Sequence, residues 1–247
     1  MRPAATGRND DAIGGEVSPA RIALSWGVHL FTASGAVIGA VALVEIGSGN
    51  LPRAALLMLA AFGIDALDGT LARAVGVAQA LPQIDGRRLD DMVDFLNYVV
   101  VPAVFMVAAG TLPHWGFAAL PVIASCYGFS QVAAKTEDDF FLGFPSYWNI
   151  VAIYAWGLGT SPAMGAVIVG FLSFMVFVPI KYAYPSKLTV LRTPTAVLGF
   201  LWTLTLAICV LAPDRVRAFH LLELTLAYPV YYLAISLWLG GLHREAA

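Results

Sequence analysis

The sequence predicts an all-α integral membrane protein, a bundle of about eight transmembrane helices. Of its 247 residues, 59% are hydrophobic and only 12% are charged, whereas a soluble domain usually carries about a quarter charged residues. The apolar residues gather in long runs that approach the roughly 20 residues needed to cross a bilayer. The formal net charge of -2 argues against nucleic acid as a partner.

The first 18 residues differ from the rest of the chain. They are polar, contain Gly and Pro, and have no short apolar core with a cleavage site, so they do not read as a signal peptide. We therefore expect residues 1–18 to form a cytoplasmic tail and residues 19–247 to form a single transmembrane domain. Cys126 and Cys209 lie inside apolar runs, which favours packing roles over a disulfide or a thiolate metal site.

Apolar stretches in chain order define the expected spans. Trp and Tyr near several of their ends are typical of residues at the membrane interface. The fifth stretch is short and is expected to be a tilted or partial span. The predicted spans are 20–46, 53–75, 88–110, 113–134, 146–160, 162–181, 194–212 and 217–240.

The distribution of Lys and Arg predicts the orientation, because cytoplasmic loops carry an excess of both. With the N-terminus inside and eight spans, the C-terminus is also cytoplasmic, and 11 of the 14 basic residues fall on the inner side against 3 on the outer side. The loop 76–87 is then cytoplasmic. The inner set is Arg2, Arg8, Arg21, Arg73, Arg87, Arg88, Lys135, Lys181, Lys187, Arg192 and Arg244, and the outer set is Arg53, Arg215 and Arg217.

Four aspartates stand at or near membrane depth, where an ionised carboxylate is costly without a partner. Asp65 and Asp68 are three residues apart and Asp90 and Asp94 are four apart, so each pair shares one face of a helix. Two helices that each present two carboxylates can hold divalent cations between them. Oxygen ligands of this kind suit Mg²⁺ or Mn²⁺.

The aspartates belong to a longer pattern that resembles the signature of the CDP-alcohol phosphatidyltransferases, an integral-membrane family. Eight positions match that signature, although the twelve residues between its two halves are more than is usual in the family. The longer interval, with VHLFTASG at 28–35 and the loops 135–146 and 181–193, is similar to the bacterial phosphatidylcholine synthase branch. The matching positions are Asp65, Asp68, Gly69, Ala72, Arg73, Gly86, Asp90 and Asp94.

The resemblance implies a catalytic core of roughly the first six helices, a homodimer, and a place in the bacterial inner membrane with the active site at its cytoplasmic face. It also implies two divalent cations, Mn²⁺ or Mg²⁺, held by the four aspartates. Asp65, Asp68 and Asp90 would be metal ligands, and Asp94 would serve as both ligand and general base.

The same resemblance implies a nucleotide and pyrophosphate site at Asp68, Gly69, Ala72, Arg73 and Gly86. A bare backbone at the two glycines lets a nucleotide approach closely, and Arg73 can donate two parallel hydrogen bonds to a phosphate. The alternatives are close helix packing through the glycines and a positively charged cytoplasmic anchor at Arg73.

The acceptor is predicted from aromatic and acidic residues at the cytoplasmic rim. Choline is a fixed cation, so its site should offer aromatic faces and a nearby carboxylate. Tyr98 lies one turn after Asp94, and Trp148 follows an acidic loop that contains Glu137. For any one aromatic residue, interfacial anchoring or packing is the alternative. His29, in the first span, is expected to be a buried structural histidine.

By resemblance, the chain transfers the phosphatidyl group of CDP-diacylglycerol to choline, giving phosphatidylcholine and CMP. Two alternatives remain open at this point. The acceptor of the same reaction could be serine, glycerol 3-phosphate or an inositol compound, because Lys135, Lys181 and Arg192 could bind a carboxylate or phosphate. In a different class, the aspartates could line the path of a divalent-cation transporter.

Overall fold

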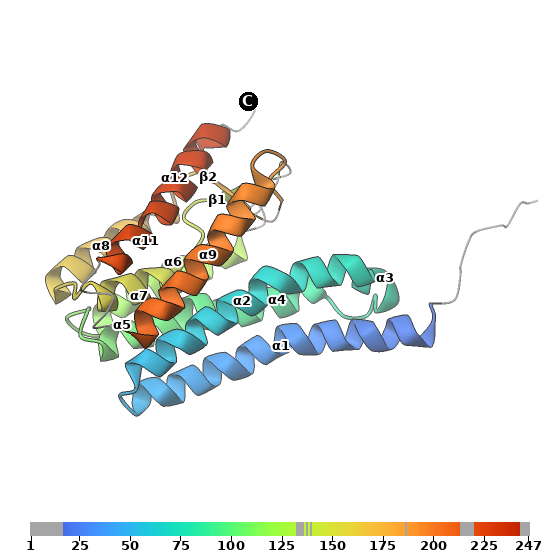
Figure 1. The fold of residues 1–247 in the computed structure, drawn as a ribbon, viewed down its shortest axis with the longest axis horizontal. Helices are drawn as coiled ribbons and strands as arrows, with labels where there is room; N and C mark the ends of the chain where they lie inside the picture. Colours follow the sequence, from blue (N-terminus) through green and yellow to red (C-terminus); the bar gives the residue numbers. More distant parts are fainter. Residues whose placement is uncertain are drawn as a thin grey trace, which may run out of the picture.

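The computed structural model describes residues 17–131, 136, 138, 140–185, 187–212 and 220–242, and this part of the chain is mostly helical. It opens with α1 (Pro19–Gly47) and α2 (Leu51–Val75), which lie side by side in Figure 1. Only three residues join them, so the two helices are antiparallel neighbours. The short helix α3 (Val77–Ala80) then turns the chain back toward the bundle.

The third long segment is a single helix with an irregular centre. It consists of α4 (Gly86–Asp94), the π-helical turn η1 (Phe95–Val100) and α5 (Val101–Ala108). The N–H of Val101 donates to the carbonyl of Leu96, five residues back. Such π-turns inside α-helices are frequent at functional sites.

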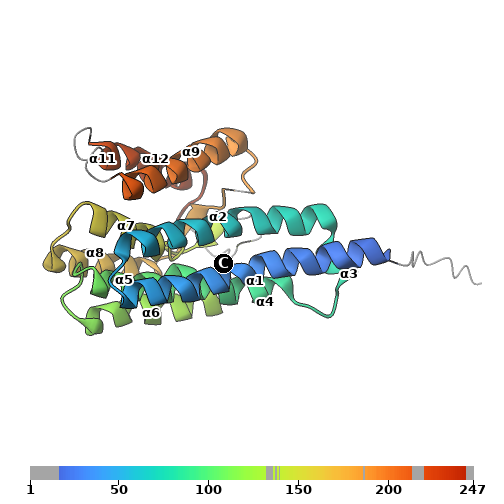
Figure 2. The same cartoon turned by 60° about the horizontal axis from the view of Figure 1, so that its bottom comes forward.

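The remaining described helices follow in two groups along the chain. They are α6 (Trp115–Ser130), α7 (Trp148–Gly157) and α8 (Pro162–Met175), followed by α9 (Arg192–Leu211), α11 (Leu221–Thr225) and α12 (Ala227–Leu239). In Figure 2, α9, α11 and α12 form a separate layer on one side of α2 and α7.

A small antiparallel sheet is present that the sequence patterns did not predict. It joins β1 (Phe140–Leu142), β2 (Ile180–Ala183) and β3 (Gly241–Leu242) in that order. Phe141 pairs with Tyr182, and Lys181 pairs with Gly241. The sheet therefore connects the two predicted loops 135–146 and 181–193.

Each predicted span contains helix in the described part of the chain. Five helical segments are long and apolar enough to cross a membrane: Pro19–Gly47, Leu51–Val75, Gly86–Ala108, Arg192–Leu211 and Leu221–Leu239. Large apolar side chains such as Leu30, Phe200 and Trp238 are about 70% exposed, as expected for surfaces that face lipid. These features indicate a multi-pass, helical membrane protein, whereas the count of eight spans stays a prediction.

Two sets of local contacts position α1, α2 and the third helical segment. Arg21 on α1 donates from Nε to the carbonyl of Val75 and from Nη2 to that of Gly76, so it caps the C-terminal end of α2. Farther along α1, a Cβ at Gly35 would lie 2.9 Å from Val93, and one at Gly39 would lie 2.5 Å from Asn97. Small residues thus let α1 approach α4 and η1 closely.

Candidate active site

Three of the four predicted aspartates come together between α2 and α4. Asp65, Asp68 and Asp90 each offer a carboxylate oxygen, and these oxygens all lie within 4.8 Å of one another. Asp68 is buried, while Asp65 and Asp90 are partly buried. The spacing of three residues on α2 puts its two carboxylates on the same face, as expected. This trio of carboxylates, Asp65, Asp68 and Asp90, is called the acidic cluster below.

Asp94 lies on α4 one turn after Asp90 and is partly buried, but it is not one of the three aspartates whose oxygens lie within 4.8 Å of one another. The start of α4 is fixed by Asp85, whose Oδ1 accepts hydrogen bonds from the backbone N–H groups of Arg87 and Arg88. An aspartate at this position is a favourable N-cap. The cap therefore places Gly86 at the first turn and sets the register in which Asp90 faces α2.

The π-turn η1 brings two polar side chains toward the neighbouring helices. The hydroxyl of Tyr98 donates to Oδ2 of Asp65 at 2.5 Å, and Tyr98 is only 4% exposed. Nδ2 of Asn97 donates to the carbonyls of Gly35 and Val93, both at 3.0 Å. Asn97 thereby binds α1 to the irregular turn, and Tyr98 binds this turn to the acidic cluster.

The glycines and the arginine of the motif surround the same end of α2 and α4. A Cβ at Gly69 would lie 3.3 Å from Nη1 of Arg73, whose Nη2 also donates to Thr70 at 3.2 Å. Ala72 is partly buried one position before the exposed Arg73. A Cβ at Gly86 would lie 3.3 Å from Cε1 of His29 on α1.

His29 is buried, as the sequence predicts, but it is not fully hydrogen-bonded. It is 8% exposed, and its Nε2 has no hydrogen-bond partner among the described residues. A buried polar atom of this kind usually has a partner. Because His29 lies against Gly86, its ring nitrogen is a candidate polar contact at this end of α4.

Comparison with known proteins identifies the scaffold that carries this cluster. Residues 28–178 match the sequence profile of the family described as CDP-alcohol phosphatidyltransferase. The chain belongs to the CDP-alcohol phosphatidyltransferase family. The matched region contains the acidic cluster, Asp94 and all the glycine and arginine positions of the motif.

Similar curated members of this phosphatidyltransferase family carry the name phosphatidylcholine synthase. The protein of Legionella bozemanae is 42% identical over 82% of this chain and 98% of its own length. That of Pseudomonas aeruginosa is 34% identical over 90% and 94%, respectively. That of Legionella pneumophila is 45% identical over 66% of each chain. The chain is therefore a phosphatidyltransferase.

Of the three residues predicted to contact the acceptor, the structure describes Tyr98 and Trp148. Tyr98 adjoins Asp65, as described above. Trp148 is fully buried, and its indole N–H donates to Oγ of Ser125 at 2.8 Å. Glu137 lies outside the described residues. Acceptor contact by Tyr98, Trp148 and Glu137 thus stays a prediction, and the buried, hydrogen-bonded Trp148 does not favour it.

Tyr184, which the sequence analysis did not single out, also lies near the acidic cluster of this phosphatidyltransferase. It follows β2, and its ring is 4.6 Å from that of Phe141 between centroids. Burial, together with the negative charges of Asp65, Asp90 and Asp94, raises the pKa of Tyr184 to about 12, opposed by the charge of Arg73. The aromatic character of the segment after residue 181 was the available signal.

The chemistry of the acidic cluster fits a hard divalent cation. All three side chains offer carboxylate oxygens, the ligand type that Mg²⁺ and Mn²⁺ prefer. The partly buried setting also makes a cation favourable, because three close carboxylates repel one another without one. The cluster can therefore bind metal.

Proposed function

We propose that this enzyme transfers the phosphatidyl group from CDP-diacylglycerol to choline, producing phosphatidylcholine and CMP. The observation that carries the proposal is the acidic cluster of Asp65, Asp68 and Asp90 within the family motif. The phosphatidylcholine synthases that resemble this chain over most of its length support choline as the acceptor. Their names also support the one-step route from the CDP-activated lipid.

Each residue of the motif has a separate role in the proposed reaction. Asp94 accepts the proton of the choline hydroxyl as its oxygen attacks the lipid-linked phosphorus, while the bond to the oxygen of CMP breaks. Arg73 donates to the phosphate oxygens, and Gly69, Ala72 and Gly86 leave room for the nucleotide beside the helix backbones. Tyr98 holds the carboxylate of Asp65 in one orientation through its hydrogen bond.

Two divalent cations, Mn²⁺ or Mg²⁺, would be held by Asp65, Asp68, Asp90 and Asp94. When bound, they supply positive charge that offsets the pyrophosphate and the charge developing on the phosphoryl oxygens and on CMP. The close approach of three of these carboxylates supports the proposal. Asp94, one turn farther along α4, would act as ligand and base together.

The proposed setting is a bacterial inner membrane with both termini and the active site on the cytoplasmic side. The excess of Lys and Arg on the predicted inner loops supports this orientation. We also retain eight spans in a single transmembrane domain over residues 19–247, a six-helix catalytic core, and a homodimer. The agreement between the predicted spans and the helices supports the first of these.

An acceptor screen tests the proposal. The purified protein in detergent, supplied with CDP-diacylglycerol and Mn²⁺, should convert labelled choline to phosphatidylcholine and release CMP in equal amount. Parallel reactions would contain labelled serine, glycerol 3-phosphate or inositol. Conversion of one of these in place of choline would overturn the acceptor assignment and leave phosphatidyl transfer intact.

A second assay separates the enzyme from a divalent-cation transporter. Protein reconstituted in sealed vesicles should release CMP from CDP-diacylglycerol when choline is present and should not move Mn²⁺ across the bilayer when it is absent. Metal uptake without any CMP release would contradict the proposed chemistry.

A further inference from the structure

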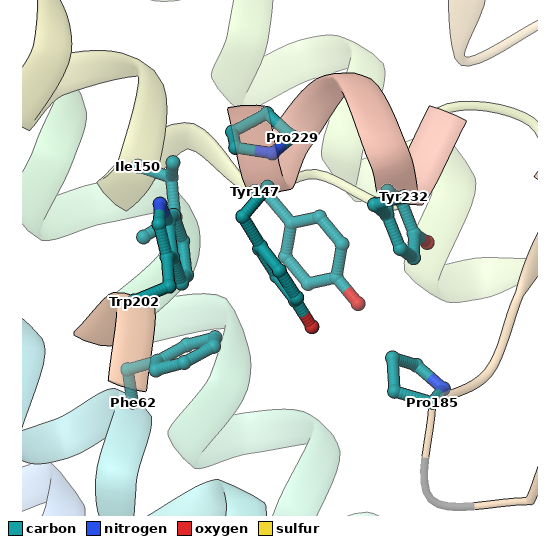
Figure 3. Close-up of a pocket in the computed structure, with 8 residues that line it drawn as sticks. Phe62, Tyr147, Ile150, Pro185, Trp202, Pro229 and Tyr232 are labelled. Carbon is teal, nitrogen blue, oxygen red and sulfur yellow. The ribbon is translucent and has the colours of Figure 1, made fainter. Parts of the chain in front are cut away.

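A partly open space lined mainly by rings lies between α2, α7 and the outer layer of helices. It has a volume of about 90 Å³, whereas one water needs only about 10–15 Å³, so it can hold a group of several heavy atoms. Figure 3 shows the rings of Phe62, Trp202, Tyr147 and Tyr232 around it, with Pro185 at its edge. Tyr228 also lines it. We call this space the aromatic cavity.

Trp202 and Tyr232 each donate a hydrogen bond to a group outside the cavity. Trp202 donates from Nε1 to the hydroxyl of Tyr154 at 2.9 Å, and the hydroxyl of Tyr232 donates to the carbonyl of Ala183 at 3.0 Å. The rings of Trp202 and Tyr228 stack with centroids 4.9 Å apart. These contacts hold the rings in place around the cavity.

The start of α7 aims Tyr147 into the same space. Ser146 has a φ of 56°, an uncommon conformation for a residue with a side chain, and it is held by a hydrogen bond of 2.9 Å with Ser125. The indole N–H of Trp148 also donates to Oγ of Ser125. The two neighbours of Tyr147 are thus anchored in the core, which leaves Tyr147 to line the cavity.

The chemistry of the lining selects one class of ligand. None of the eight lining residues that the structure describes carries a formal charge, and five of them are aromatic. A quaternary ammonium group has no hydrogen-bond donor to satisfy and is attracted to aromatic rings. A carboxylate or a phosphate would find no cation there, and its desolvation would be uncompensated.

The aromatic cavity lies next to the acidic cluster. Phe62 stands three residues before Asp65 on the same face of α2, about 4.5 Å along the helix axis. Tyr147 is 6.0 Å from Tyr98 between ring centroids, and Tyr98 donates to Asp65. In choline, two carbons separate the hydroxyl from the nitrogen. A cavity one helical turn from the cluster therefore matches the length of the acceptor.

We propose that the aromatic cavity binds the trimethylammonium group of choline, and that α9 and α12 supply its decisive walls through Trp202, Tyr228 and Tyr232. The proposal rests on the proposed function, because it assigns the acceptor subsite of that reaction. It also gives the outer layer of helices a role: the layer completes the acceptor site with residues that lie beyond the matched family region of 28–178.

Substitution of the walls tests the proposal. Trp202→Leu and Tyr228→Leu should each raise the KM for choline about tenfold or more and leave the KM for CDP-diacylglycerol nearly unchanged. Tyr228→Phe keeps the ring and should raise the KM for choline much less than Tyr228→Leu does. The matched control is Trp238→Leu, an exposed aromatic residue on α12, the helix that also carries Tyr228, and it does not line the cavity.

If a leucine variant does not fold, competition by choline analogues in the wild-type enzyme provides a second test. Tetramethylammonium should compete with choline and not with CDP-diacylglycerol, and the uncharged isostere 3,3-dimethylbutan-1-ol should compete at least about tenfold more weakly. Equal competition by the uncharged compound would overturn the proposal.

Two other results with the leucine variants would each point to a different use of the cavity. Leucine variants that raise the KM of CDP-diacylglycerol and not that of choline would show that the cavity holds an acyl chain of the donor. Unchanged values for both substrates would make it a packing void. Either result refutes the aromatic cavity as the acceptor subsite while the proposed function stands, whereas a wild-type enzyme that does not convert choline refutes both.

Discussion

The hydroxyl of Tyr98 donates a hydrogen bond of 2.5 Å to Oδ2 of Asp65, joining the π-turn of the third helical segment to the acidic cluster on α2. Tyr98 is almost completely removed from bulk water, and Asp65 is partly buried. A hydrogen bond to a charged carboxylate is stronger than one between neutral groups. It therefore holds Asp65 in a single orientation toward Asp68 and Asp90.

Tyr98→Phe tests this positioning role. The loss of one charge-assisted hydrogen bond should lower kcat about tenfold to a hundredfold and raise the Mn²⁺ concentration needed for half-maximal rate. The measurement is initial rate against Mn²⁺ at saturating substrates. The control is Tyr127→Phe, a half-exposed tyrosine on α6. An unchanged metal dependence would leave Tyr98 a packing residue.

Asp94→Asn tests the assignment of the base. The amide cannot accept the hydroxyl proton, so turnover should fall by about 10²–10⁴-fold, while binding of CDP-diacylglycerol should be largely retained. Equilibrium binding of labelled donor and release of CMP are the two measurements. Asp68→Asn, within the acidic cluster, should instead weaken metal binding. Full turnover in the Asp94 variant would contradict its role as base.

His29→Phe tests the contact expected from the unpartnered ring nitrogen. The substitution keeps a ring against Gly86 but removes the nitrogen, and it should raise the KM for CDP-diacylglycerol about fivefold, the value of one ordinary hydrogen bond. The KM for choline should not change. A loss of thermal stability with unchanged kinetics would mean that His29 is structural only.

Gly39→Leu tests the close approach between α1 and η1. A Cβ at this position would already lie 2.5 Å from Oδ1 of Asn97 and 3.1 Å from Leu96, so overpacking should cost about 1–3 kcal/mol of stability. Thermal unfolding in detergent measures the effect. The control is Gly27→Leu on the same helix, where a Cβ would meet no atom within 4 Å. Equal stability of the two variants would argue against the contact.

The ion pair between Asp138 and Lys181 gives a pH-dependent prediction. The Lys181 ammonium lies 2.7 Å from the carboxylate, and its hydrogen bond lowers the pKa of Asp138 below the usual value. A lowered pKa stabilises the folded state above the unfolded pKa of about 3.9, and this stability is lost as the pH falls through the folded pKa. Asp138 is exposed, so the pair contributes at most about 1 kcal/mol.

Asp138→Asn should therefore lower the melting temperature slightly at pH 7, and the difference from the wild type should shrink as the pH falls toward the lowered pKa and the wild-type carboxylate becomes protonated. Thermal unfolding of both proteins across this pH range measures the difference. A difference that stays constant with pH would show that the charge of Asp138 is not its source.

Local sequence patterns were sufficient to predict the helices and the facing of the aspartates. The apolar runs predicted helix in each span, and the spacing of Asp65 with Asp68 put both carboxylates on one face of α2. These inferences need only the periodicity of one helix. The motif also predicted the family, because its eight positions lie within one short stretch of chain.

Long-range packing decided what local patterns could not. The π-turn at Phe95–Val100, the pairing of β1 with β2, and the meeting of Asp90 with Asp65 and Asp68 all depend on contacts between distant elements. Trp148 shows the limit clearly: its place after an acidic loop favoured a ligand contact, but packing turned its indole toward Ser125 and left Tyr147 facing the cavity.

The sequence by itself thus determined a helical membrane protein with paired carboxylates and a phosphatidyltransferase motif, because these follow from the order of residues along single helices. Only the tertiary structure decided that Phe62, Tyr147, Trp202, Tyr228 and Tyr232 surround one cavity. Tyr228 and Tyr232 are one turn apart on α12, but the other three residues are far from them and from one another in the chain, so no local period relates the whole set. Their meeting follows from the way α9 and α12 pack over α2 and α7.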